Sequence, residues 1–524
     1  MKSKSVKILV AVALVVTTMI VIFYSCKDDK SIDTSNLEVD EAVHVSSNDI
    51  NSFLAKYPKL NQYKSQLNKL YESQNSETIW YNENEEVQEL AGVLRYNLQN
   101  ISKEGIKEKT PYLQEFNHIF TNEVDSPNSI KSNDILISGL YLYYNDKVYE
   151  GSVNSRKLGW YIDKNKIDYI HLIDTIKANP NVDIKKIAII DQYYKLHEKL
   201  IYYTDIEKKG GWNKVEFKSD NLPIHLGDTS SVVIAVKKRL IKEDFLNDDN
   251  TSNVFNIGLQ AAINKYQQIN SITTNDTIIN KELLVSLNKT VSEKIKTLKV
   301  NMERCRWVNP KLLNSEELIF VNIPSFELDY IKNNTSAFKT KVVVGKNASK
   351  TVIFNDEMSY IVFAPYWNVP KSIINSEIIP GMDKDENYLE KHKMEWNDGN
   401  VRQIPGPWNS LGLVKFIFPN SNNIYLHDTP SKNLFKKDER AFSHGCIRVK
   451  DPDILAEKIL SNDPNWNREK IYEAMNSSKE KAYKLQNKIP VVISYFTAWV
   501  NDNGELRFYD DVYNRDNRLA KIIL

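Results

Sequence analysis

The chain has 524 residues, more than one ordinary hydrophobic core accommodates, so two to four domains are expected. Its composition, 41% hydrophobic and 26% charged, is that of a folded protein and excludes a largely disordered chain. The 69 basic and 68 acidic residues leave a net charge of +1, which gives no electrostatic basis for a nucleic-acid partner. The cysteines Cys26, Cys305 and Cys446 are too few and too widely spaced for a disulfide framework or a zinc site, so no metal or cofactor is expected.

Residues 1–26 are typical of an export signal. Three lysines precede an apolar run from Ile8 to Tyr24, and Cys26 follows a small residue at the end of that run. This arrangement resembles a lipoprotein processing site, in which Cys26 would be lipidated. An uncleaved single-pass anchor is the alternative. In both cases the positive start predicts that the bulk of the protein lies outside the cytoplasm, in a bacterial envelope, facing the periplasm and attached to a membrane.

A long helical region follows a short polar tether. Residues 27–49 are polar with few apolar anchors, which predicts the tether. In residues 50–212 apolar positions recur every three or four residues, as in Glu86–Leu94 and Ile135–Tyr143. No reactive cluster is found there, so this part is predicted to be a helical scaffold domain.

Residues 220–298 form a second, smaller helical unit. It opens with Leu226-Gly227-Asp228, continues with an amphipathic stretch at Val232–Leu240 and a helix that contains Ala262–Gln267, and closes with Leu287-Asn288. These features resemble the small three-helix peptidoglycan-binding module. Tyr266 replaces the usual Phe, and Asn275-Asp276-Thr277 replaces the usual Asp-Gly. A packed helical spacer is the alternative to a glycan-binding module.

The periodicity changes to two after a linker at 299–317, and residues 318–524 are predicted to form a mostly-β domain with a few helices. A helix is expected at Pro452–Leu460, and strands are expected at Leu318–Ile323, Phe326–Ile331, Lys339–Val344, Met358–Phe363 and Pro490–Thr497. The whole chain is therefore predicted to be a multidomain α+β protein.

Two segments carry the chemistry. Cysteine is a nucleophile only as a thiolate, so Cys446 needs a base, and His427 stands at the end of the apolar run Ile424–Leu426. A strand ending there would present His427 to a cleft. Gly445 lets a substrate carbonyl approach the backbone amides of Gly445 and Cys446, which are the natural oxyanion donors. Asp428 and nearby backbone carbonyls are both candidates for orienting His427.

Arg448 follows Cys446 by two residues and would share its face of an extended stretch. Its guanidinium suits a substrate carboxylate, held by two parallel hydrogen bonds. Ser443 and His444 are expected to shape the turn before the nucleophile, and His444 is the second candidate for the base. A lone cysteine is more often a small buried apolar residue, but here the His427 and Cys446 segments occur together in a specific order.

The joint pattern of His427 and Ser443-His444-Gly445-Cys446-Ile447-Arg448 resembles the signature of the YkuD-type L,D-transpeptidases. Further segments resemble the large multidomain subgroup: the linker before the catalytic domain, the entry to and exit from the active-site cap, and the closing strand correspond to Asn301–Trp307, Tyr366–Ile373, Pro405–Gly412 and Tyr495–Val500. Cys305 stands where that subgroup usually has Trp and is expected to be structural.

The resemblance implies that Cys446 attacks the carbonyl of the third residue of a peptidoglycan stem tetrapeptide and releases D-alanine. An amine of a second stem then resolves the thioester, which gives a 3→3 cross-link. His427 acts as general base and acid, and Trp367, Tyr425, Ser443, His444 and Arg448 contact the substrate. The partners are stem peptides and glycan, with no obligate protein partner. The polar insert at about 371–403 is predicted to be a lid that excludes water from the cleft.

Two rival functions remain open. Carboxypeptidase activity, D-amino-acid exchange and attachment of a protein to the wall use the same site and differ only in the acceptor. A non-catalytic wall-binding lipoprotein is a rival from another class, although a pure binder has no need of a thiol beside a base. A papain-like protease is excluded because that family has its cysteine before its histidine.

Overall fold

The computed structural model describes residues 43–121, 127–164, 166–179, 188–247, 252–270, 272 and 277–524. The predicted export signal with Cys26, most of the predicted tether, and Asn275 and Asp276 lie outside the described residues. Within the described part of the chain, no helix has both the length and the apolarity that are needed to cross a membrane.

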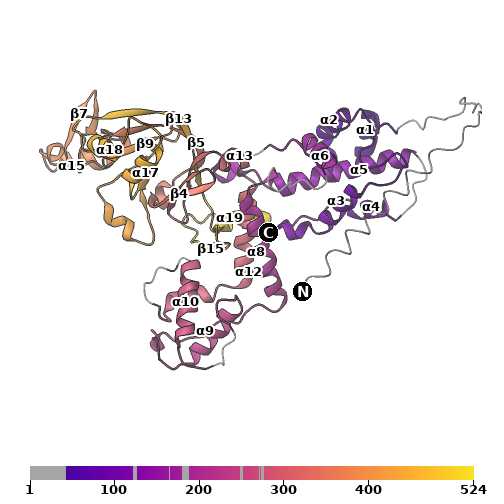
Figure 1. Cartoon of the computed structure of the whole chain (residues 1–524), viewed down its shortest axis with the longest axis horizontal. Coiled ribbons are helices and arrows are strands. Elements are labelled where there is room, and N and C mark those ends of the chain that lie inside the picture. Colours follow the sequence, from indigo (N-terminus) through magenta and orange to yellow (C-terminus); the bar gives the residue numbers. More distant parts are fainter. Residues whose placement is uncertain are drawn as a thin grey trace, which may run out of the picture. The chain divides into compact units, whose positions relative to one another are not determined.

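The region predicted as a scaffold is helical (Figure 1). Its helices are α1 (Ser47–Lys56), α2 (Lys64–Ser73), α3 (Glu89–Gln99), α4 (Leu113–His118), α5 (Pro127–Asn145), α6 (Tyr169–Ala178) and α8 (Asp191–Lys208). Ser46 and Asp49 cap each other's backbone amides at the start of α1, which satisfies amides that the first turn leaves unpaired.

A buried carboxylate fastens α5 to the chain before it. Asp134 is fully buried, and it accepts hydrogen bonds from the hydroxyl of Tyr71 at 2.5 Å and from the amides of Ile79 and Trp80 at 2.9 and 2.8 Å. Buried charges are tolerated only with such partners. This explains an acidic residue on the inner face of a core helix.

The smaller helical unit has its own apolar core. Helices α9 (Ser231–Ile241), α10 (Ile257–Ile269) and α11 (Lys281–Leu287) surround buried residues that include Leu259, Ile263 and Leu283. Side chains of Ser230, Asn256 and Asn280 cap the three helices. The predicted helical pattern is therefore found, with each helix starting at a polar cap.

A buried ionic cluster joins this unit to the long helix α12 (Val291–Cys305). Glu243 contacts Arg239 at 2.6 Å and Lys294 of α12 at 2.5 Å, and Tyr203 of α8 donates to it at 2.7 Å. All three charged side chains are almost completely buried. The two cations lower the pKa of Glu243 against the effect of burial, so the carboxylate stays ionised.

The C-terminal domain is built on a mixed sheet. Its strands are β2 (Glu317–Asn322), β3 (Glu327–Lys332), β4 (Thr335–Gly345), β5 (Ile353–Phe363), β9 (Val414–Ile417), β10 (Leu426–His427), β11 (Ala441–Ser443), β12 (Ile447–Val449) and β13 (Lys481–Ser494). The strand order is β5-β13-β2-β3-β4-β12-β10-β9, and β9 pairs back with β5. The sheet therefore closes on itself around an apolar core, and β1 (Trp160–Tyr161) from the helical region adds to β5 in parallel.

The remaining elements of this domain are the helices α13 (Pro310–Leu313), α17 (Pro452–Ile459), α18 (Arg468–Met475) and α19 (Asp516–Ile523), and the hairpin β14 (Ala498–Val500) and β15 (Leu506–Phe508). The predicted strands and the helix at 452–460 are found within a few residues. The last strand begins at Lys481, nine residues before the predicted start, because its first part pairs with β5 alone, whereas only Val491–Ser494 pair with β2. The strand β1 and the helix α19 are not apparent from the sequence pattern.

The insert predicted as a lid is an ordered unit with its own small sheet. Strand β6 (Trp367–Asn368) pairs with β8 (Asn400–Gln403), which pairs with β7 (Met394–Asn397). Between β6 and β7 lie α14 (Lys371–Ile373), η7 (Ile374–Ile378), α15 (Ile379–Met382) and α16 (Tyr388–Lys391). An apolar cluster around Val369, Ile374, Ile378 and Val401 holds the insert together.

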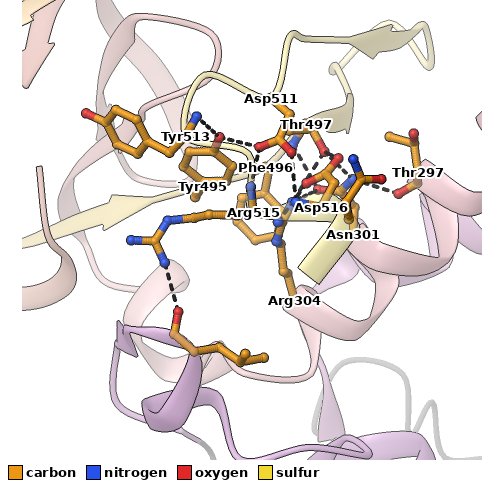
Figure 2. A network of polar contacts seen from close by, with 12 residues as sticks. Thr297, Asn301, Arg304, Tyr495, Phe496, Thr497, Asp511, Tyr513, Arg515 and Asp516 are labelled. Atoms are coloured by element: carbon orange, nitrogen blue, oxygen red, sulfur yellow. Dashed lines mark hydrogen bonds and ion pairs between the residues drawn. The ribbon is translucent and has the colours of Figure 1, made fainter. Parts of the chain in front are cut away.

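The helix α12 and the C-terminal domain share a polar network (Figure 2). Arg304 of α12 forms an ion pair with Asp516 at 2.7 Å, and Thr497 donates to the same carboxylate at 2.7 Å. Asn301 accepts from the Thr497 amide at 2.9 Å. These contacts tie α12 to the end of the sheet and to α19.

Candidate active site

Two short parallel strands bring the predicted base and the predicted carboxylate-binding residue together. In the register of β10 and β12, Leu426 pairs with Ile447 and His427 pairs with Arg448. Leu426 and Ile447 are completely buried and anchor both strands in the core. The alternation of side chains along each strand is the reason that His427 and Arg448 lie side by side on one face.

The turn that carries Cys446 is held by hydrogen bonds from both sides. Gly445 has a φ of +123°, a conformation that favours glycine. The Ser443 hydroxyl accepts from the Gly445 amide at 3.1 Å and donates to the Cys446 carbonyl at 2.6 Å. Thr351 donates to the Gly445 carbonyl at 2.8 Å. Ser443 therefore shapes this turn, and its contacts are internal to the motif.

The Cys446 thiol is half-buried between β10 and the loop that precedes it. Its thiol donates to the carbonyl of Asn423 at 3.6 Å, and both the backbone amide and the side chain of Tyr425 hydrogen-bond to the sulfur. Burial raises the pKa of the thiol, while the Tyr425 contacts and the Arg448 charge act against this rise. The site therefore holds a neutral thiol, and the same groups would stabilise a thiolate.

His427 is buried and uncharged. Its Nδ1–H donates to the backbone carbonyl of Asp428 at 2.5 Å, which leaves Nε2 without a proton in the neutral ring. Burial first, and the neighbouring Arg448 charge second, lower the pKa of His427 to about 3, although carbonyl contacts at Asp428 and Leu411 oppose the shift. The neutral ring can accept a proton at Nε2, and the lowered pKa makes it a weaker base than an ordinary imidazole.

Of the two candidates for orienting His427, the structure selects a backbone carbonyl. The carboxylate of Asp428 is engaged elsewhere, with Lys432 at 2.6 Å and with the Leu413 amide at 2.9 Å. Asp428 thus contributes to the site through its main chain, while its side chain fastens the loop at Gly412–Leu413 beneath it.

Arg448 has no counter-ion in the part of the chain that the structure describes. Among the described residues its Nε is buried without a hydrogen-bond partner, and no ion pair is formed by its guanidinium. Burial lowers the pKa of Arg448, and the proximity of Cys446 raises it. A cation beside the nucleophile that lacks a carboxylate partner is suited to bind an anionic group from outside the protein.

The predicted oxyanion donors differ in their availability. The Gly445 amide is occupied by Ser443, so it would have to exchange that hydrogen bond before it could serve a substrate. The Cys446 amide makes no hydrogen bond to the described residues. The oxyanion role of both amides stays a prediction, with Cys446 as the donor that is free in this geometry.

The remaining predicted site residues divide between the cleft and the insert. Tyr425 packs edge-on against the ring of His427, with 5.7 Å between centroids, and contacts the thiol. Exposed His444 points its Nε2 toward Glu377 of the insert at 3.9 Å. Trp367 packs on the apolar cluster of the insert, and no contact joins it to Cys446 among the described residues.

Several residues that hold the site were not apparent from the sequence. Thr351 and Asn423 belong to segments without a motif, and only the fold brings them to Gly445 and Cys446. Buried Asn409 donates to the carbonyls of Pro365, Gln403 and Ile404 at the base of the insert. A Pro-Gly-Pro-Trp-Asn segment did indicate the exit of the cap, but it did not reveal this role of Asn409.

Comparison with known proteins agrees with this geometry. The family model of the L,D-transpeptidase catalytic domain (YkuD) matches residues 316–472, and the model of the Scaffold domain matches residues 65–200. A Haemophilus influenzae protein named "Putative L,D-transpeptidase" is 34% identical over 243 residues, which are 42% of this chain and 48% of that protein. The match thus spans about half of the length of that relative.

Solved structures of L,D-transpeptidases resemble the chain weakly. The enzyme from Stackebrandtia nassauensis is 13% identical over 52% of this chain and 96% of its own, with a TM-score of 0.22. L,D-transpeptidase 3 from Mycobacterium tuberculosis, in complex with a faropenem-derived adduct, is 12% identical over 34% and 60%, with a TM-score of 0.19. The assignment therefore rests on the two family models and the sequence relative: the chain carries a YkuD-type L,D-transpeptidase catalytic domain together with a Scaffold domain.

Proposed function

We propose that this transpeptidase forms 3→3 cross-links in peptidoglycan through a thioester on Cys446. The observation that carries the proposal is the pairing of His427 with Arg448 on neighbouring strands, beside Tyr425, which contacts both the His427 ring and the half-buried Cys446 thiol. Each group matches one requirement of acyl transfer from a donor that has a free carboxylate near its scissile amide.

In the acylation step, Nε2 of His427 takes the thiol proton while the sulfur of Cys446 attacks the carbonyl of the third residue of a stem tetrapeptide. The tetrahedral oxyanion is stabilised by backbone amide donation, with the Cys446 amide as the available group. Collapse breaks the amide bond, and the proton on Nε2 passes to the nitrogen of the leaving D-alanine. A thioester remains on Cys446.

In the second step, a side-chain amine from another stem attacks the thioester. Nε2 of His427 accepts a proton from the attacking amine and returns it to the sulfur when the C–S bond breaks. The product is an amide between two third-position residues, and the free thiol is regenerated. Arg448 supports the first step by binding the carboxylate of the terminal D-alanine.

The insert supports transpeptidation over hydrolysis. It is an ordered unit with its own core, and it reaches the nucleophile motif through the Glu377–His444 contact. We infer that it shields the thioester from water, so that the amine acceptor is used.

We also propose that the protein is a periplasm-facing lipoprotein attached through Cys26. The proposal rests on Cys26, which follows Ser25 at the end of the apolar run, on the lysines before that run, and on a substrate that lies outside the cytoplasm. Metabolic labelling with a palmitate analogue tests it: label on the wild type and none on Cys26→Ala supports lipidation, whereas membrane attachment of an unlabelled wild type favours the single-pass anchor.

The catalytic proposal is tested with the full chain in mild detergent and purified disaccharide-tetrapeptide. Mass spectrometry follows D-alanine release and dimer formation, with Cys446→Ala as the inactive control. Dimers linked between third residues, absent from the control, are the expected result. D-alanine release without dimers would assign carboxypeptidase activity or another acceptor. The absence of both products from a folded sample would favour the wall-binding alternative.

A further inference from the structure

A cavity outside the site around Cys446 is lined by basic residues. Its volume of about 500 Å³ is typical of small-molecule sites. It lies between the scaffold segment 156–161, helix α12, and the C-terminal segment 513–519. The described residues that line it include no Asp and no Glu, and its charged members are Arg156, Lys157, Arg304, Lys350, Arg515 and Arg518.

Of these six cations, only Arg304 has a carboxylate partner among the described residues, Asp516 at 2.7 Å. No ion pair of the other five is found in the same part of the chain. Three of them instead donate to main-chain carbonyls: Arg515 to Leu158 at 2.8 Å, Lys350 to Tyr513 at 3.1 Å and Arg518 to Lys157 at 3.3 Å. Arg156, Lys157, Lys350 and Arg518 are exposed, so solvent screens their charges in part, but a described lining with cations and no acidic residue favours an anion.

The acidic groups nearest in sequence offset part of this charge, since Asp516 pairs with Arg304 and Asp511 attracts the Arg515 guanidinium. Asp511 accepts hydrogen bonds from the hydroxyl of Tyr495 and from the backbone amides of Arg515 and Asp516 (Figure 2). Asp516 is shared by Arg304 and Thr497 (Figure 2). Both carboxylates are therefore committed to the network beside the cavity.

Two donors in the lining also lack partners. The indole Nε1–H of Trp160, a residue that is 2% exposed, and the buried Nε–H of Arg515 have no acceptor among the described residues. A buried donor without an acceptor costs about 1–3 kcal/mol. Both groups are donors, as are the cations around them, and they show that this part of the fold is short of acceptors, although their burial keeps them from direct contact with a ligand.

The main chain at Gly159 leaves space for the guanidinium of Arg515. Gly159 has a φ of +73°, and a Cβ at this position would lie 3.2 Å from Nη1 of Arg515. The turn at Leu158-Gly159 therefore allows Arg515 to lie against it and present its remaining N–H groups to the cavity. Arginine forks match phosphate oxygens in pairs, and lysine adds a mobile point charge.

We propose that this cavity, defined by Arg156, Lys157, Trp160, Lys350, Arg515 and Arg518, binds a phosphate-type anion with two or more negative charges. The proposal is independent of the transpeptidation proposed above, because it concerns binding at a separate place. The phosphate can belong to a soluble polyphosphate compound or to a phospholipid headgroup, and both present the same oxygens.

The cavity is connected to the nucleophile by hydrogen bonds. The hydroxyl of Tyr513, a lining residue, donates to the Gly345 carbonyl at 2.6 Å and accepts from the Thr351 amide at 3.2 Å. The Thr351 hydroxyl in turn donates to the carbonyl of Gly445, directly before Cys446. A ligand that shifts Lys350 or Tyr513 would therefore also shift Thr351, which holds the turn before Cys446.

The test is calorimetric titration of the full chain in zwitterionic detergent with inorganic pyrophosphate. The double variant Lys350→Gln/Arg518→Gln removes two charges from the lining. Arg468→Gln, which removes an exposed arginine on α18, is the matched control. Wild type and control are expected to bind with the same affinity, more weakly as salt is raised, and the double variant at least about tenfold more weakly.

Further titrations test whether the phosphate belongs to a phospholipid headgroup or to a soluble polyphosphate. Glycerol 3-phosphate, the soluble headgroup of a phospholipid with a phosphate monoester, should displace pyrophosphate if the headgroup is the ligand and should not if a soluble polyphosphate is. Citrate tests whether phosphate chemistry is required. Cys446→Ala should bind like the wild type, which separates this site from the catalytic one. No binding of pyrophosphate by the wild type, equal affinity in a folded double variant, or equal binding of citrate would overturn the proposal.

Discussion

His427 and Arg448 lie directly opposite each other on the parallel strands β10 and β12. This pairing places a permanent positive charge beside the proposed base. The charge lowers the pKa of His427 and also opposes the rise in the pKa of the Cys446 thiol. Arg448 thus favours a neutral imidazole in the free enzyme and a thiolate when the proton is withdrawn, in addition to its proposed contact with the substrate.

The pH dependence of the reaction should reflect this environment. Because the pKa of His427 is lowered to about 3, the base stays unprotonated well below the ordinary value of 6.5, and kcat/KM should show no acid limb near pH 6.5. Arg448→Gln removes a positive neighbour and should move the acid limb to higher pH. Rates of D-alanine release between about pH 4 and 8 measure both. An acid limb near 6.5 in the wild type would contradict the assignment.

The same shift has a consequence for stability. The folded-state pKa of His427 lies below its unfolded value, so the unfolded chain binds an extra proton as the pH falls from about 6.5 toward 3. The free energy of unfolding contributed by this group is therefore full above pH 6.5 and is lost as the pH decreases through that window. Urea denaturation at about pH 7 and pH 5 should show a larger loss in the wild type than in His427→Gln.

The roles of the two histidines near Cys446 can be separated by substitution. His427→Gln should lower kcat for D-alanine release by about 10²–10⁴-fold, the usual contribution of a general base. His444→Gln removes only an exposed group that contacts Glu377 at 3.9 Å, so it should change kcat by less than about threefold. A loss of activity in His444→Gln as large as that in His427→Gln would make His444 the base.

Gly412 should be required for the position of Asp428. Its φ is +62°, and a Cβ there would lie 2.3 Å from Cγ of Asp428. Gly412→Ala should therefore cost the left-handed strain and about 1–3 kcal/mol of overpacking, and it should lower kcat because Asp428 holds His427. Gly504→Ala is the matched control, since Gly504 has a φ of +76° and a Cβ added there would meet nothing within 4 Å.

Urea denaturation and D-alanine release of both glycine variants test this prediction. The difference between their free energies of unfolding isolates the clash with Asp428 from the strain that they share. Equal destabilisation and unchanged kcat would show that the Asp428 loop adjusts freely.

Removal of the insert at about 371–403 should reduce dimer formation while Cys446 stays reactive. Trp367 pairs with Gln403, and Val369 donates to the Val401 carbonyl, so the strands approach closely enough to be joined after deletion of residues 370–400 by an Asn-Gly turn. We expect this variant to release D-alanine faster and to form few dimers, because water reaches the thioester. Mass spectrometry gives the ratio of dimer to released D-alanine, with Glu377→Gln as a control that keeps the insert. An unchanged ratio would show that the insert is not a lid.

The sequence by itself determined the elements and the chemistry that depend on local pattern. Alternating apolar residues identified the strands that became β2 to β5, and apolar periodicity of three and four identified the helices α9 to α11. The pair of motifs around His427 and Cys446 pointed to acyl transfer, since nucleophile and base are recognised by residue type and order.

Only the tertiary structure decided how these parts meet. The pairing of His427 with Arg448, the burial that lowers the pKa of the imidazole, and the choice of the Asp428 carbonyl over its carboxylate depend on how the strands and loops pack. The cationic cavity likewise joins residues near 158, 350 and 515, none of which forms a motif. Local pattern encodes a residue's own backbone and exposure, whereas partners, burial and electrostatic environment arise from packing, which a single sequence does not reveal.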